Sequence, residues 1–192
     1  MALAPAPLAF YGLIALWVGG ELWLDWRKRS GVGAQGRDRG SLRLLSVVIY
    51  LSVAVAVWLS FRGWLRFPAS LSGPLFWLGL VAMAAGLALR WWAIRVLDRF
   101  FTVDVAVHAD HRLVRDGPYR RLRHPSYTGS LLTFLGFGLA LGNWASLLVA
   151  MVPVTLAFLR RIRVEEQALR EVFPAEYEAY ARQTRRLLPF LW

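Results

Sequence analysis

Two clusters of polar residues in the second half of the chain have side chains that can bind a charged ligand. Residues 123–129 read Arg-His-Pro-Ser-Tyr-Thr-Gly and stand directly before an apolar segment. Pro125 disfavours helix at His124, so His124 is expected in irregular backbone at a helix entrance, with Ser126 as a candidate cap. The free N–H groups and the positive dipole end of such an entrance suit a carboxylate or a phosphate.

The second cluster, residues 160–166, reads Arg-Arg-Ile-Arg-Val-Glu-Glu. Glu165 and Glu166 are neighbours on a helix and point about 100° apart, so they do not form a paired acid/base dyad. Acids at this depth suit a cationic ligand, such as an ammonium or a sulfonium. A site with His124 on one side and an acid on the other fits a zwitterion, such as an amino-acid moiety. The alternative from these residues alone is a solvated helix start beside lipid headgroups.

Metal and nucleic acid are disfavoured as ligands. The chain has no cysteine, and no acid falls at a familiar ligand interval from His108, His111 and His124. The formal net charge is +11, but the basic residues lie between apolar segments, without the aromatic-basic sheet pattern of a nucleic-acid surface. We therefore predict no metal site and no nucleic-acid partner, and we attribute the basic residues to topology and anionic lipid headgroups.

The elements that must position these clusters are membrane helices. The chain is 57% hydrophobic, with a mean hydropathy of +0.44, which is apolar for a soluble domain. We predict an all-α, polytopic integral membrane protein with about five transmembrane helices and a cytoplasmic C-terminal catalytic region. Two short apolar segments joined by Gly142-Asn143 should form a tight helical hairpin, and Gly79 and Gly86 should allow close helix packing. The expected apolar segments are 7–24, 42–61, 75–97, 127–141 and 144–159, and the third of them follows the helix-start signal Gly73-Pro74.

The distribution of basic residues predicts the orientation. Of the 23 Lys and Arg residues, all but Arg62 and Arg66 lie in the segments 26–43, 90–123 and 160–192. The positive-inside rule then places the N-terminus outside, the C-terminus in the cytoplasm and both polar clusters on the cytoplasmic side. We predict one membrane domain over 1–192, with two N-terminal spans and their loops in 1–72 and a core in 73–192.

The ordered set of motifs in this core resembles the isoprenylcysteine carboxyl methyltransferase family, to which phospholipid methyltransferases are similar. The resemblance covers residue 85 to the C-terminus, a little over half of the chain, and the first two spans carry no signature. The motifs that carry it are His111-Arg112-Leu113-Val114, Gly117-Pro118-Tyr119, residues 123–129, Glu165-Glu166, Phe173, Glu176-Tyr177, Tyr180 and Leu188-Pro189.

The resemblance implies a membrane enzyme that uses S-adenosylmethionine, enclosed by the C-terminal half at the cytoplasmic face. Arg161 matches a position assigned to substrate, where its guanidinium would hold and orient a carboxylate. The positions that match cofactor-binding residues are His111, Arg112, Leu113, Val114, Tyr119, His124, Pro125, Ser126, Tyr127 and Glu165.

The expected function is methylation of a lipophilic acceptor, with O-methylation of a prenylcysteine-like carboxylate as the leading hypothesis. An ionised carboxylate needs no general base, so such an enzyme mainly aligns donor and acceptor and excludes water. The lipid tail would enter sideways from the bilayer, through a gap between the third span and the hairpin. The alternatives are N-methylation of a phospholipid or other small lipid, and a non-catalytic membrane scaffold or transporter. The expected location is a bacterial inner membrane.

Overall fold

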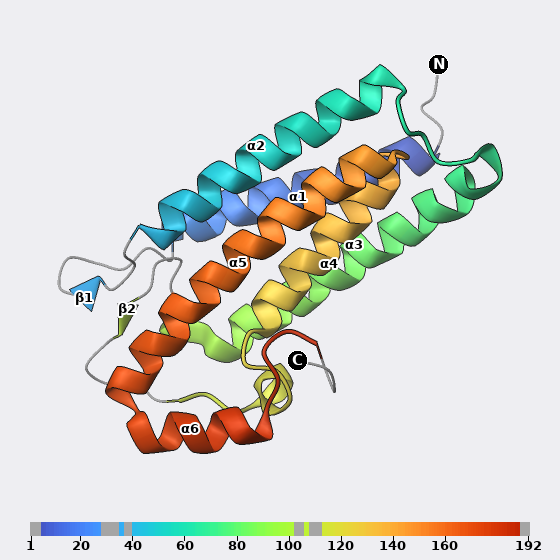
Figure 1. The fold of residues 1–192 in the computed structure, drawn as a ribbon. Helices are drawn as coiled ribbons and strands as arrows, with labels where there is room; N and C mark the ends of the chain where they lie inside the picture. The colour runs from blue at the N-terminus through green and yellow to red at the C-terminus, as the bar shows by residue number, and fades with distance from the viewer. Residues whose placement is uncertain (1–4, 28–34, 37–39, 102–105, 108–112, 189–192) are drawn as a thin grey trace.

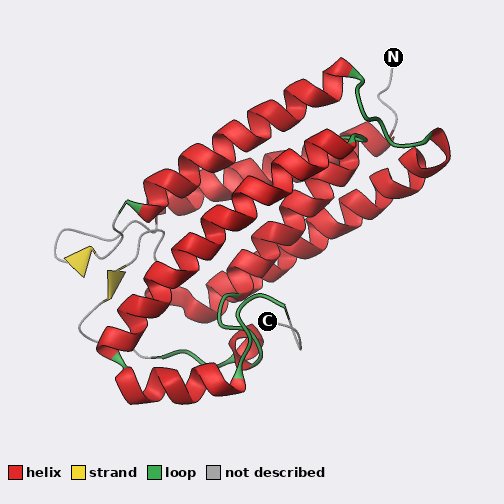
Figure 2. Cartoon of the chain, viewed as in Figure 1, coloured by secondary structure: helices red, strands yellow, loops and turns green. Residues whose placement is uncertain are grey.

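The protein is an elongated helical bundle with one helix laid across its end (Figures 1 and 2). The computed structural model describes residues 5–27, 35–36, 40–101, 106–107 and 113–188. The helices are α1 (Pro5–Arg27), α2 (Ser41–Arg62), α3 (Ala69–Leu97), α4 (Pro125–Ala140), α5 (Trp144–Val172) and α6 (Pro174–Gln183), with 3-10 turns η1 (Asp98–Phe100) and η2 (Gly117–Arg120). The strands described are β1 (Gln35–Gly36) and β2 (Ala106–Val107), which pair antiparallel with Gln35 opposite Val107. The predicted all-α fold is confirmed.

Four of the described helices are long and apolar enough to cross a membrane: α1, α2, α3 and α5. Their outer faces carry large exposed hydrophobic side chains, such as Leu51, Val81 and Leu148, each about three-fifths exposed. Apolar surface of this extent belongs in lipid, so the chain is an integral membrane protein with helical spans. Helix α4 has only 16 residues, as the short segment 127–141 indicated, and a fifth crossing stays a prediction.

Two predicted helix boundaries are wrong. Helix α3 begins at Ala69, five residues before Pro74, because Pro68 caps it and its carbonyl accepts from the amides of Leu71 and Ser72. Helix α5 continues beyond the apolar segment to Val172, and the break comes only at Phe173-Pro174. The second polar cluster therefore lies on the same rigid helix as a membrane span.

Helices α3 and α4 lie side by side (Figure 1) and pack at backbone contact through glycines. A Cβ added to Gly79 would lie 2.6 Å from the carbonyl oxygen of Gly136, and one added to Gly86 would lie 2.6 Å from that of Gly129. The close packing expected of Gly79 and Gly86 is confirmed. A lipid tail cannot pass between α3 and α4 at these positions, so the expected entry gap is not there.

The end of the described chain returns to the start of α4, as Figure 2 shows. The amide of Arg123 donates to the carbonyl of Arg185 at 2.7 Å, and the amide of Arg185 donates to the carbonyl of Arg121 at 2.9 Å. The amide of His124 donates to the carbonyl of Arg186 at 3.1 Å. This two-segment pairing anchors the first polar cluster against the C-terminal segment, residues 184–188.

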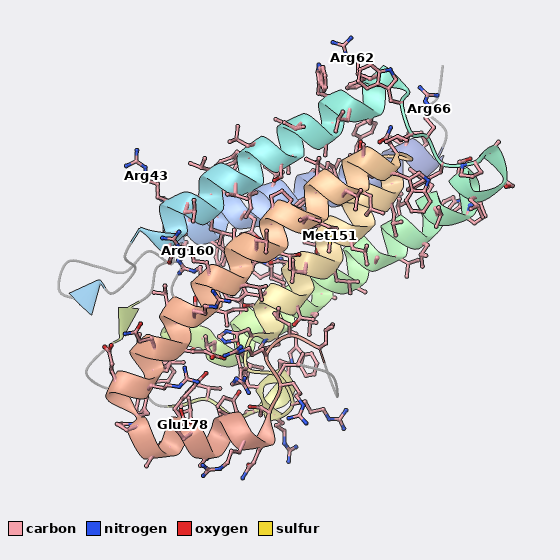
Figure 3. All side chains as sticks on the ribbon, viewed as in Figure 1. Arg43, Arg62, Arg66, Met151, Arg160 and Glu178 are labelled. Carbon is pink, nitrogen blue, oxygen red and sulfur yellow. The ribbon has the colours of Figure 1, made fainter. Side chains whose placement is uncertain are left out.

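Charged side chains lie at both ends of the bundle, far from each other along its length. In Figure 3, Arg62 and Arg66 lie at one end, Met151 lies midway, and Arg43, Arg160 and Glu178 lie towards the other. Arg62 and Arg66 therefore lie far from Arg160 of the second polar cluster.

Candidate active site

The two polar clusters meet where the first turn of α4 faces α5. The Tyr127 hydroxyl donates to Oε1 of Glu165, and Nε of Arg161 donates to both groups, at 3.0 Å to the Tyr127 oxygen and 3.2 Å to the carboxylate. Arg161 lies one turn before Glu165 on α5, which is the spacing that brings helical side chains together. Arg161 is 1% exposed, while the Glu165 side chain is 23% exposed. The cluster therefore contains a partly exposed carboxylate, that of Glu165, beside a buried guanidinium, that of Arg161.

His124 occupies the N-cap position of α4 and lies between two carboxylates. Its Nδ1 is 3.5 Å from Oε2 of Glu165, and its Nε2 is 3.4 Å from Oε1 of Glu166. The imidazole stacks on the ring of Tyr127, with centroids 5.7 Å apart and planes 9° apart. The expectation that Ser126 caps the helix is wrong, because Pro125 already occupies the first helical position and Ser126 follows it inside the first turn.

The charge state of His124 follows from this position. Burial alone would lower its pKa, but the two carboxylates outweigh burial and raise the pKa above the ordinary 6.5. The ring is buried, and its Nε2 has no hydrogen bond of good geometry. The two carboxylates thus favour the protonated form of His124, which does not suit proton abstraction.

Glu166 belongs to the Glu165-Glu166 motif of the resemblance but is not among the positions matched to cofactor binding. Its carboxylate is fully buried and accepts from Nε of Arg123 at 3.0 Å and from Nη2 of Arg186 at 2.9 Å. The predicted divergence of the adjacent acids is confirmed: Glu165 faces Tyr127, whereas Glu166 faces the C-terminal segment. The sequence holds no signal for Arg186, because the pairing joins residues that lie 20 apart.

The other residues predicted to bind the cofactor differ in burial, and two of them lie outside the described residues. Tyr119 is buried in η2, and burial, with Tyr180 and Glu165 as further causes, raises the pKa of its phenol well above 10. Leu113 and Val114 are half-buried in the segment that leads to η2. His111 and Arg112 lie outside the described residues. So does His108, which was considered with His111 and His124 as a metal ligand. Within the described residues, no group of three His, Asp or Glu side chains could hold a metal ion.

One residue from the N-terminal half also reaches the cluster. Nη1 of Arg161 donates to Oγ of Ser41 at 3.1 Å, and Ser41 is buried at the start of α2. Sequence reasoning missed this contact, because a single serine before an apolar segment has no distinguishing pattern.

Fold and site together define a polytopic helical membrane protein with a charged, partly buried site at one end of its bundle. A family profile described as phospholipid methyltransferase matches residues 74–176, more than half of the chain and all of the cluster except Ser41 and the C-terminal segment. The chain belongs to the phospholipid methyltransferase family.

Individual relatives agree with the resemblance inferred from the motifs. The chain is 35% identical over 117 residues to a probable protein-S-isoprenylcysteine O-methyltransferase of Oryza sativa subsp. indica, covering 60% of this chain and 61% of that protein. It is 34% identical over 133 residues to the protein-S-isoprenylcysteine O-methyltransferase of Schizosaccharomyces pombe, covering 66% and 56%. The chain thus spans about three-fifths of the length of these curated relatives.

The fold also has a solved counterpart. The chain is similar to the structure of a eukaryotic intramembrane Ras methyltransferase, isoprenylcysteine carboxyl methyltransferase, with a TM-score of 0.70 and 23% identity. The likeness covers 100% of this chain and 70% of that one, so the arrangement of α1 and α2 is shared as well as that of the core.

Proposed function

We propose that this protein is a membrane methyltransferase that uses S-adenosylmethionine and methylates a carboxylate of a prenylcysteine-like lipid. The observation that carries the proposal is the meeting of His124, Tyr127, Arg161 and Glu165 in one cluster. These residues belong to motifs that lie far apart in the sequence and inside the matched family region. The two relatives are named as protein-S-isoprenylcysteine O-methyltransferases, which supports the choice of acceptor.

The residues present fit the amino-acid moiety of the cofactor. Glu165 is a partly exposed carboxylate that can hold an ammonium, and we propose that the buried His124, whose Nδ1 lies 3.5 Å from Oε2 of Glu165, orients that carboxylate. Tyr127, Tyr119, Pro125 and Ser126 lie at or near the same helix entrance, and the matched positions His111, Arg112, Leu113 and Val114 are proposed to line the cofactor as well. When bound, the cofactor supplies a methyl group on a positively charged sulfur. The chain's own residues bind it, orient it and exclude water.

Arg161 is proposed to orient the acceptor carboxylate. Its guanidinium is held by Tyr127 and Glu165, so the acceptor would lie directly beside the cofactor residues. A carboxylate is already ionised at neutral pH, whereas an amine acceptor must first lose a proton. His124 has a raised pKa and is flanked by two anions, so it does not provide the base that an amine would need. This favours the carboxylate over the phospholipid amine.

An apolar cleft on the surface of the bundle is the site that we propose for the lipid tail of the acceptor. An apolar cleft of about 410 Å³ lies between α1 and α3, with Gly19, Gly20 and Trp91 among its lining residues. Arg90, next to Trp91, packs its backbone on Gly129, two residues after Tyr127. We propose that the tail lies in this cleft, which α3 lines with a different face from the one that contacts α4.

The membrane orientation is part of the same proposal. We place the N-terminus outside and the site at the cytoplasmic surface of a bacterial inner membrane, with 1–192 acting as one membrane domain. Support comes from the separation of Arg62 and Arg66 from the site end of the bundle (Figure 3).

The proposal is tested by calorimetric titration of S-adenosylmethionine into the purified, full-length protein in lipid nanodiscs. We expect binding, and a loss of about 30-fold or more in affinity for Glu165→Ala, because the variant loses the partly exposed carboxylate that is proposed to hold the ammonium. The matched control is Glu178→Gln on α6, an exposed acid that pairs with Arg170 and not with Tyr127 or Arg161. No binding to folded wild-type protein would refute the methyltransferase proposal and favour the scaffold.

The acceptor is tested by methyl transfer from labelled cofactor. An N-acetylated S-prenyl cysteine is compared with the same compound carrying an amide in place of its carboxylate, and with an amine-headgroup phospholipid. For Arg161→Ala, we expect KM for the prenyl cysteine to rise far more than Kd for the cofactor. Methylation of the phospholipid instead of the prenyl cysteine would overturn the choice of acceptor.

A further inference from the structure

We propose that Ser41, at the start of α2, is a positioning residue that sets the guanidinium of Arg161 for the acceptor carboxylate. The inference rests on the proposed function of Arg161. It assigns part of the site to the N-terminal half of the chain, since Ser41 lies outside the matched residues 74–176.

The contact is buried at both ends. Oγ of Ser41 accepts from Nη1 of Arg161 at 3.1 Å, and the two residues are 3% and 1% exposed. A hydrogen bond to a charged group in such a place is among the stronger ones, because water cannot replace the lost partner.

Three helices together fix the plane of this guanidinium. Tyr127 on α4 and Glu165 on α5 bind its Nε, while Ser41 on α2 binds its Nη1 on the other side. A planar guanidinium recognises a carboxylate through paired, directed N–H groups, so its orientation matters as much as its charge. Loss of the Ser41 hydroxyl removes the partner of Nη1 on α2 while the two partners of Nε stay in place.

The position of Ser41 is itself defined by the backbone. Gly40 before it has φ 71° and ψ 11°, in the left-handed region that favours glycine, and the amide of Leu44 closes the first turn on the carbonyl of Gly40 at 3.1 Å. The hydroxyl is thus presented from the first residue of a helix and not from a mobile side chain on a loop.

A matched control exists on the same pair of helices. Oγ of Ser146, which is fully buried on α5, donates to the carbonyl of Ala56 on α2 at 2.7 Å, beyond the middle of the bundle from Ser41. Ser146→Ala therefore removes a buried serine hydroxyl from the α2–α5 interface without touching the site. It reports what a purely structural loss does to the enzyme.

The test measures methyl transfer and cofactor binding for Ser41→Ala, Ser41→Thr and Ser146→Ala in full-length protein in nanodiscs. For Ser41→Ala, we expect kcat/KM for the N-acetylated S-prenyl cysteine to fall about tenfold, mainly through KM, while Kd for S-adenosylmethionine changes less than about twofold. Ser41→Thr keeps a hydroxyl and should restore most of the loss, and Ser146→Ala should leave both constants within about twofold of wild type.

The outcomes separate this inference from the proposed function. Wild-type protein that neither binds cofactor nor transfers a methyl group would overturn both. An active wild type whose Ser41→Ala variant keeps its kcat/KM would overturn the role of Ser41 alone. Equal losses in Ser41→Ala and Ser146→Ala, or no recovery with threonine, would assign the effect to helix packing and would also overturn it.

Discussion

Glu166→Gln should destabilise the protein more than a comparable change at any exposed acid. The carboxylate is fully buried and binds Arg123 of the α4 entrance and Arg186 of the C-terminal segment, with Nη2 of Arg170 at 3.6 Å. Glutamine has nearly the same volume, so no cavity forms. The substitution removes the negative charge that faces Arg123, Arg186 and Arg170.

The expected magnitude follows from the burial of the partners. Loss of one member of a fully buried ion pair costs about 3–5 kcal/mol. The side chains of Arg123 and Arg186 are 11% and 28% exposed, so water screens part of the loss, and we take the lower limit of about 3 kcal/mol. For a chain of this size, that corresponds to a fall in Tm of about 6–12 °C.

The assay is thermal unfolding in nanodiscs, combined with limited trypsin digestion. Undocking of the C-terminal segment frees the backbone of Arg185, which pairs with Arg121 in the native protein, so Glu166→Gln should be cleaved there faster. Glu178→Gln is the control, because its 2.8 Å pair with Arg170 joins side chains that are 51% and 42% exposed and contributes less than about 1 kcal/mol. A Tm for Glu166→Gln within 2 °C of that control would refute the reasoning.

Three further predictions concern neighbouring features. The pKa of His124 is raised in the folded protein, so protonated His124 should contribute fully to stability below pH 6.5, its pKa in the unfolded chain. This contribution should decrease as the pH rises through the pKa of the folded state. Tm measured against pH should show the decrease, and His124→Gln should remove most of it. Gly129→Ala puts a Cβ 2.6 Å from the backbone of α3 and should cost about 1–3 kcal/mol, seen as a lower Tm, whereas Gly73→Ala meets nothing within 4 Å and should leave Tm unchanged or raise it. Tyr127→Phe removes the hydroxyl that donates to Glu165 and should weaken cofactor binding about tenfold by calorimetry, with an unchanged Kd contradicting the proposed pocket.

The site also explains why α4 begins where it does. Its entrance is held by backbone pairing with the C-terminal segment and by Arg123 donating to Glu166 and to the carbonyl of Thr184, the latter at 2.6 Å. A helix start that carries ligand-binding residues is thus supported by segments that come later in the chain. Changes to the C-terminal segment should therefore affect the site without touching its residues.

Much of the fold and part of the site are determined locally, and the sequence alone was enough for them. A long apolar segment must hide its backbone polar groups in a helix when it lies in lipid, which makes the all-α fold predictable. A proline after His124 ends regular structure on its N-terminal side, which placed residues 123–129 at a helix entrance. Gly79 and Gly86 predicted close packing because only small residues let two helix backbones touch.

Tertiary structure decided what depends on distant partners. Whether Glu165 or Glu166 would be buried could not be read from two adjacent acids, because the answer depends on Arg186 and on the docking of the C-terminal segment. The contribution of Ser41 depends on α2 packing against α5, and a lone serine has no periodic pattern that predicts it. The length of α5 was also missed, since its last turns are polar and gain stability from ion pairs across the site instead of from burial in lipid. The sequence thus determines which residues have the chemistry, and the packing of the helices decides which of them share a site.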